Sequence, residues 1–150
     1  MEISIKVDKS SVMKEVEQTT AYTGAKMEKD DDAIERIPTI DEDVPQLERF
    51  WEECRSDICQ ELIGIVAYEG EAAGQYELRL EVSRSFDESL LPSMKISLFS
   101  YFVQSIAAKW YVYTNKTEAG EYADKAATLL DDIHRKAVYK KKPIRPTYDD

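Results

Sequence analysis

Hydrophobic and polar residues alternate along two short stretches of the chain and follow helical spacing along most of the remainder. Alternation over residues 2–7 places isoleucine and valine on one face, which predicts a half-buried strand. Residues 75–83 alternate more strictly and predict a second strand that pairs with the first. An isolated strand pair is marginally stable, so we expect this β element to pack on helices or to pair across subunits.

The first half of the chain also carries two helical patterns. A weak apolar stripe over residues 10–22 predicts a helix that begins after Asp8. A continuous stripe at spacings of three and four predicts a second helix from near Asp43 to about Ala67. Residues 70–74, which are small and glycine-rich, are then expected to form the turn before the second strand.

The second half of the chain predicts a helical hairpin. Residues 91–113 are apolar nearly all round, which is typical of a central, buried helix. The next helix begins after Asn115 and ends in the lysines before Pro143. The loop between them is short, so the two helices are expected to pack antiparallel. Close approach is expected where the fourth helix carries small side chains, at Ala119, Ala123 and Ala126.

These elements predict a mainly α fold of about four helices, a bundle with a central buried hairpin, plus a small β element. The 150 residues and 17.3 kDa are enough for one domain with its own core. We expect a single helical domain over residues 1–142, in which residues 28–43 form an acidic loop or arm. Residues 143–150 are expected to be an extended C-terminal tail.

Charge and hydropathy exclude several classes of function. The net charge is −10 and the pI is near 4.7, which disfavours nonspecific binding of the whole chain to nucleic acid or an anionic membrane. The longest uncharged run, residues 96–108, is shorter than the about 20 apolar residues of a membrane span. The first residues alternate rather than forming an apolar run, so no secretory signal is expected.

Few residues in the sequence point to catalysis. Cys54 and Cys59 lie about 140° apart around the predicted helix, so we expect two reduced, buried thiols rather than a disulfide or a metal pair. The single histidine, His134, follows Asp131 by three residues. This pair is either an ordinary helix-end contact or the core of an enzyme site, with or without metal. A metal site needs three or four ligands, so we expect no metal here. We also expect no cofactor and no catalytic residue.

Aromatic residues gather at the predicted turn of the helical hairpin. Four tryptophan and tyrosine side chains lie within this short part of the sequence: Trp110, Tyr111, Tyr113 and Tyr122. They are expected to form part of the core with an amphipathic rim, or to anchor an interface, where such side chains are favoured.

Charges of opposite sign are segregated along the chain. The acidic stretch at 28–43 includes Asp30, Asp31 and Asp32, and is either a solvated strip or a docking strip for a basic partner. Basic residues gather at the other end of the sequence: Arg135, Lys136, Lys140, Lys141, Lys142 and Arg145. Separated patches of opposite sign suit head-to-tail contact between identical subunits, which closes into a ring when the rotation permits. The basic end could alternatively contact DNA phosphates or another subunit.

The order of these elements resembles a family of phage proteins. An acidic lead-in, an amphipathic helix over 47–65 and a β segment precede a buried helix that ends Ala-Ala-Lys-Trp-Tyr-Val-Tyr at 107–113. Thr-Asn-Lys-Thr-Glu-Ala at 114–119 then opens a long helix that ends in Lys-Lys-Lys-Pro. Over about residues 41–143 the chain resembles the small helical head–tail connector (neck adaptor) proteins of tailed phages and prophages.

The resemblance implies a non-enzymatic ring adaptor. Its partners would be copies of itself and portal or tail components, with no membrane contact. It would be found in the bacterial cytoplasm during assembly and then in the virion. The alternative expectation is a monomeric acidic module that binds or regulates a basic protein.

Overall fold

The computed structural model of this protein describes residues 1–26, 38–39 and 43–141. Within these residues, four α-helices and a three-stranded antiparallel sheet confirm the predicted mainly α class with a small β element. In chain order the elements are β1 (Glu2–Asp8), α1 (Lys9–Lys26), α3 (Val44–Glu61), β2 (Val66–Ala72), β3 (Gln75–Glu81), the short 3₁₀ helix η2 (Glu88–Leu90), α4 (Leu91–Thr114) and α5 (Lys116–Val138).

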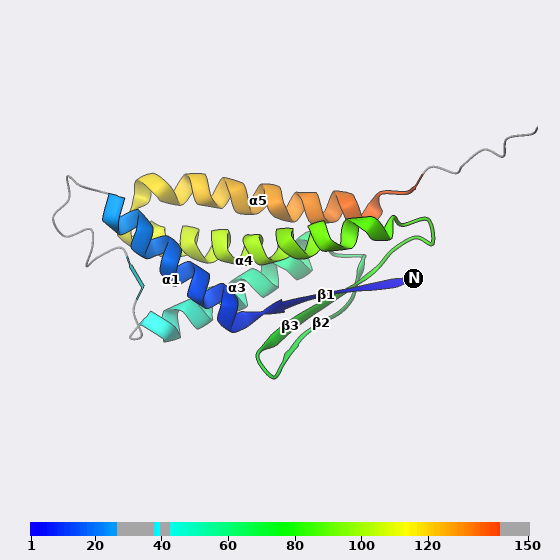
Figure 1. The fold of residues 1–150 in the computed structure, drawn as a ribbon, viewed down its shortest axis with the longest axis horizontal. Coiled ribbons are helices and arrows are strands. Elements are labelled where there is room, and N and C mark those ends of the chain that lie inside the picture. Colours follow the sequence, from blue (N-terminus) through cyan, green and yellow to red (C-terminus); the bar gives the residue numbers. More distant parts are fainter. Residues whose placement is uncertain (27–37, 40–42, 142–150) are drawn as a thin grey trace, which may run out of the picture.

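The helices form layers around α4. Figure 1 shows α5 as the outer layer, α4 below it as the middle layer, and α1, α3 and the sheet together on the other side of α4. The long antiparallel hairpin of α4 and α5 confirms the predicted pairing of these two helices. The first turn of α1 is held by Asp8, whose carboxylate accepts hydrogen bonds from the side chains of Ser10 and Ser11 and from the backbone N–H of Ser11.

The sheet has the strand order β1-β3-β2. The predicted pairing of the two alternating segments is confirmed, because β1 runs antiparallel to β3 with Ile3 opposite Leu80 and Ile5 opposite Leu78. The expectation that residues 75–83 pair across subunits is wrong for this fold. β3 is the central strand, and both of its edges are already hydrogen-bonded within the chain.

The strand β2 was not predicted, and the second helix is shorter than expected. The helix α3 ends at Glu61, and Gly64, with φ of 95°, turns the chain into β2 instead of continuing the helix to Ala67. Residues 70–74, which were expected to form the turn, therefore lie mostly in strand β2. Only Ala73 and Gly74 form the turn, and both have positive φ, as a tight two-residue hairpin requires.

Two glutamates of β2 point toward the helices rather than toward solvent. Glu71 lies opposite the buried Tyr76 across the strand pair, and Glu69 lies opposite the buried Leu78. Arg55 of α3 binds Glu69 at 2.6 Å and Glu71 at 3.5 Å, and the hydrogen bond that Arg55 donates to Glu69 raises the pKa of Arg55 above its ordinary value. Lys9 binds Glu71 at 3.2 Å from the other side. These ion pairs attach α3 and the start of α1 to β2.

An aromatic cluster fills the core where α3, α4 and β3 meet. Trp51 stacks on Phe102, with ring centroids 4.2 Å apart and an interplanar angle of 16°. Tyr76 of β3 meets both rings edge-on, at 6.0 Å and 5.0 Å. All three side chains are fully buried. Such aromatic pairs contribute roughly 0.5–1.5 kcal/mol beyond the burial of their surface.

The prediction that α4 is buried nearly all round is only partly correct. The middle of the helix, residues 101–103 and 105–108, is buried all round, but Ile96 is 68% exposed and Tyr113 is 70% exposed. Because α1, α3, the sheet and α5 cover different parts of this long helix, both of its ends keep apolar residues at the surface.

We predict that two side-chain truncations on α4 differ sharply in their effect on the free energy of unfolding. Phe102→Ala should lower the free energy of unfolding by about 3–5 kcal/mol, because it empties the space between Trp51 and Tyr76. Ile96→Ala, on the same helix, should change it by no more than about 0.5 kcal/mol, because the side chain is exposed. Urea unfolding followed by circular dichroism measures both, and similar costs at the two positions would contradict this packing.

Candidate functional site

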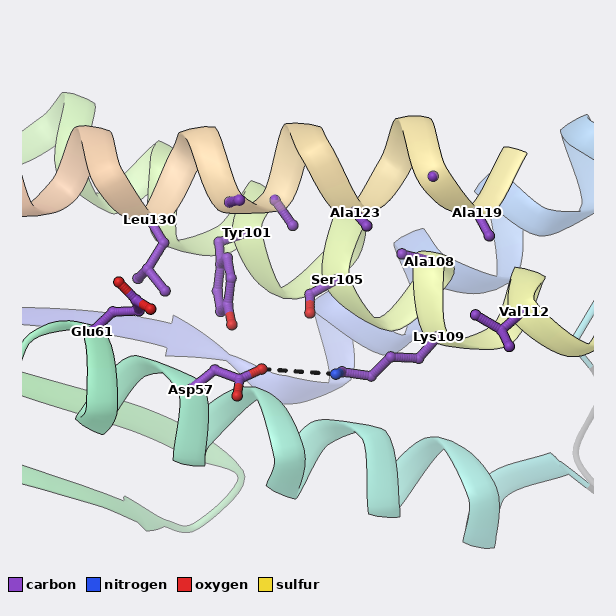
Figure 2. A pocket seen from close by; sticks show the side chains of 13 residues that line it. Asp57, Glu61, Tyr101, Ser105, Ala108, Lys109, Val112, Ala119, Ala123 and Leu130 are labelled. Atoms are coloured by element: carbon purple, nitrogen blue, oxygen red, sulfur yellow. Dashed lines mark ion pairs between the residues drawn. The ribbon is translucent and has the colours of Figure 1, made fainter. Parts of the chain in front are cut away.

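An open groove lies between α3 and α5, with α4 as its floor. Its volume is about 510 Å³, within the roughly 300–1,000 Å³ typical of ligand pockets. Figure 2 shows Glu61 and Leu130 near one end and Val112 and Ala119 near the other. The residues that line it come from all three helices: Asp57, Glu61, Tyr101, Ser105, Ala108, Lys109, Val112, Ala119, Gly120, Ala123, Ala126, Ala127 and Leu130.

The groove is apolar because α5 presents small side chains on this flank. The buried stripe of α5, which packs on α4, consists of Ala126, Leu130, Ile133 and Ala137. Ala123 and Ala127 lie beside that stripe, are exposed and line the groove. The prediction of close helix approach therefore fits Ala126, whereas Ala123 leaves open space above α4.

The rim of the groove along α3 is acidic. Asp57 and Glu53 share one cation, Lys109 of α4, at 3.7 Å and 3.6 Å respectively. Figure 2 shows the Asp57–Lys109 pair spanning from α3 to α4. Glu61, four residues further along α3, is exposed at the end of the groove. Three acidic side chains and one lysine thus leave a negative charge along this wall.

Polar groups beneath the floor are kept neutral by burial. Desolvation raises the pKa of the Cys54 thiol to about 12, against a weaker opposing effect of its hydrogen bond with Ser105. Desolvation likewise raises the pKa of Tyr101 above its ordinary value. At physiological pH the floor of the groove therefore offers the neutral hydroxyl of Tyr101, while the Cys54 thiol lies beneath it. Among the described residues, the charges that line the groove lie on Asp57, Glu61 and Lys109.

The residues that the sequence analysis selected as interface candidates fall into two groups. Asp30, Asp31, Asp32, Lys142 and Arg145 lie outside the described residues. The others lie on or just beyond the C-terminal end of α5: Arg135, Lys136, Lys140 and Lys141.

Part of this predicted basic cluster is neutralised within α5. Arg135 pairs with Asp131 at 3.1 Å, and Lys136 pairs with Asp132 at 2.8 Å, each one helical turn away. Desolvation opposes ionisation of Asp132, but its hydrogen bonds from Lys136 and Ser97 lower its pKa below the ordinary value.

The end of the basic cluster is held by backbone bonds. The helix α5 ends at Val138, earlier than the predicted lysines, and Tyr139 is extended. Lys140 forms a β-bridge with Phe86, and the backbone N–H of Lys141 donates to the carbonyl of Ser85 at 2.8 Å. The side chains of Lys140 and Lys141 are exposed, and neither forms an ion pair with another described residue. Arg135 is also exposed but pairs with Asp131, so among the described residues of the cluster Lys140 and Lys141 are the exposed cations without an ion pair.

The other chemical candidates of the sequence are the Asp131–His134 pair and the two cysteines, and among the described residues they form no metal site. The ion pair of Asp131 is with Arg135, and not with His134. The part of the chain that the structure describes contains no group of three or more histidine, cysteine, aspartate or glutamate residues arranged to hold a metal ion. Both cysteines are free, as expected, but only Cys54 is buried, while Cys59 is half-buried. Among the described helices, none is long and apolar enough to cross a membrane.

The aromatic residues at the hairpin turn divide between core and surface. Tyr111 is buried, meets Tyr122 edge-on at 5.0 Å, and donates a hydrogen bond of 2.8 Å to Thr23 of α1. Tyr113 is exposed and stacks on Phe50 of α3. The predicted combination of core and rim is therefore confirmed for this cluster.

Sequence reasoning missed the groove itself. Its residues carry no motif, and alanine on a helix is compatible with close packing as well as with open space. The one usable signal was the row of exposed-face alanines at Ala119, Ala123 and Ala127, which lies beside the core stripe of α5. Comparisons of the chain with protein-family models, with curated proteins and with solved structures find no match.

We predict that the two thiols differ in reactivity in the folded protein. At pH 8, a thiol reagent should label Cys59 and spare Cys54, whose pKa of about 12 and burial leave almost no accessible thiolate. Both should react after unfolding in guanidinium chloride. Mass spectrometry of labelled peptides measures this, and equal labelling of the two thiols in the native state would contradict the buried position of Cys54.

Proposed function

We propose that this protein is a non-enzymatic structural adaptor that assembles with copies of itself, in the manner of the head–tail connector proteins of tailed phages. In this proposal it acts in the bacterial cytoplasm during virion assembly and then within the virion, between portal and tail components. The family resemblance of the sequence motivates the phage setting, and the groove between α3 and α5 supports the adaptor role.

The observation that carries the proposal is the open apolar groove. The core of the fold is complete beneath it, because the aromatic cluster and the buried stripe of α5 pack without any contribution from the exposed alanines. Solvent therefore contacts exposed side chains of the groove, such as Ala123 and Ala127, that the core does not need. Concave apolar surfaces with a few charged groups at the rim are typical of binding sites.

The groove favours a protein ligand over a small charged one. Its donors, Tyr101, Ser105 and Lys109, lie beside the carboxylates of Asp57 and Glu61, which disfavour phosphate, and its alanines leave room for side chains of a partner. The anchors of protein interfaces are apolar or aromatic side chains in such depressions, surrounded by a charged rim.

A second candidate function is favoured by the acidic rim. Glu53, Asp57 and Glu61 along one wall suit a cationic partner, so a monomeric module that binds a basic protein is the alternative. The two functions differ in what the isolated protein does, because only the adaptor assembles without another protein.

We predict that the purified protein forms an oligomer whose mass is a multiple of 17.3 kDa. Multi-angle light scattering on a sizing column, over a range of protein concentrations and at low and physiological salt, measures it. Ala127→Glu should shift the mass toward the protomer, since it places a bulky acidic side chain in the groove. Ala127 is exposed, so the fold should persist.

The matched control is Thr128→Glu, the adjacent and equally exposed position on the opposite flank of α5. It adds the same charge but leaves the groove open, and should keep the mass of the unmodified protein. A protein that stays monomeric at every concentration and at both salt levels would overturn the adaptor proposal and support the monomeric binding module.

A further inference from the structure

The C-terminal end of α5 carries exposed apolar and basic side chains, whereas the wall of the groove is acidic. Val138 and Tyr139 are each 51% exposed, so both side chains present apolar surface to solvent. Lys140 and Lys141 follow them and are exposed. The backbone bonds to Phe86 and Ser85 hold this segment in place against the loop before α4. The result is an ordered projection with an apolar base and a cationic tip, here called the α5 end (residues 138–141).

The groove and the α5 end are complementary in both polarity and charge. The groove is lined mainly by alanine, valine and leucine, with Tyr101, Ser105 and Lys109 on α4, and it has an acidic wall with Asp57 and Glu61. The α5 end offers an exposed valine and tyrosine to the floor and two lysines to the wall. We propose that the groove of one subunit receives the α5 end of a second copy, an inference that rests on the adaptor function proposed above.

A subunit does not fill its own groove in this way. Leu130 marks the near end of the groove, and Val138 lies eight residues further along the same helix, which is about 12 Å at 1.5 Å per residue. The helix is continuous between the two positions, and the segment after it is tied to the loop at Ser85. The α5 end therefore points away from its own groove and toward a neighbour.

This contact is heterologous, because the two surfaces that meet are different parts of the chain. Each subunit keeps one groove and one α5 end, so every bound subunit presents a free site for the next. Contacts of this kind close into a ring when the rotation between subunits permits, and otherwise continue as a filament. The contact is thus the type that a ring adaptor needs.

The test uses two variants that each remove one half of the contact. Ala127→Glu obstructs the groove and leaves the α5 end intact. Lys140→Glu combined with Lys141→Glu reverses the charge of the α5 end and leaves the groove intact. Each variant alone should elute at the protomer mass of 17.3 kDa. An equimolar mixture should form a pair of twice that mass, in which the α5 end of the first variant occupies the groove of the second.

The control for the charge reversal is Lys14→Glu combined with Lys116→Glu. Both lysines are exposed, and neither is part of the α5 end or the groove lining. This variant changes the net charge by the same amount and should keep the mass of the unmodified protein. Circular dichroism of all variants verifies that they are folded.

The outcomes separate this inference from the proposed function. An unmodified protein that does not assemble overturns both. An oligomer that persists in the Lys140→Glu/Lys141→Glu variant overturns the α5 end as the occupant and leaves the adaptor function in place. Two monomeric variants whose mixture fails to pair would also overturn the inference, because a heterologous contact needs only one intact half from each partner.

Discussion

The stacking of Trp51 on Phe102 is the contact on which the arrangement of the helices depends. It joins α3 to α4 at the point where Tyr76 of β3 also enters the core. The indole N–H of Trp51 donates a hydrogen bond of 3.1 Å to Glu71, so the same residue also connects α3 to β2. The helix α3 has few contacts with α5. The contacts within this cluster therefore set the distance between α3 and α4. The cluster therefore sets the width of the groove between α3 and α5.

The charged residues of β2 protect one edge of the sheet, while β1 forms the other edge. Edge strands recruit other strands unless something prevents it, and inward-pointing charges and bulges are two common means of prevention. β2 has both: Glu69 and Glu71 face the helices, and the register shifts between Val66 and Tyr68. A strand added at this edge would disturb the ion pairs with Arg55 and Lys9 that attach α3 to β2.

Elements with a regular hydrophobic pattern could be predicted from the sequence. The prediction failed where individual residues interrupt that pattern. The helical hairpin and the pairing of β1 with β3 followed from clear periodicity. β2 was missed because its inward positions hold Glu69 and Glu71 in place of apolar residues, which removes the alternation that marks a strand. The helical stripe also continues through Leu62 and Ile65, and only Gly64, in a conformation that favours glycine, ends it.

The candidate site was less accessible to sequence reasoning than the fold. The basic cluster was found by composition, but the pairing of Arg135 with Asp131 and of Lys136 with Asp132 had to be seen in the helix. The groove depends on how far α3 stands from α5, a distance between segments that are remote in the chain. No local sequence pattern encodes this distance, because Ala123 and Ala127 look the same in the sequence whether or not a neighbouring helix covers them.

The charge distribution favours a head-to-tail contact over a two-fold one. A two-fold contact through the groove would bring the acidic wall of one subunit, with Asp57 and Glu61, against the same wall of its partner, and juxtaposed like charges are costly. In the proposed contact the lysines of the α5 end meet that wall instead. Exposed ion pairs contribute only about 0–1 kcal/mol each, so they cannot supply the affinity alone. The burial of Val138 and Tyr139 would supply it, and the charges would select the orientation.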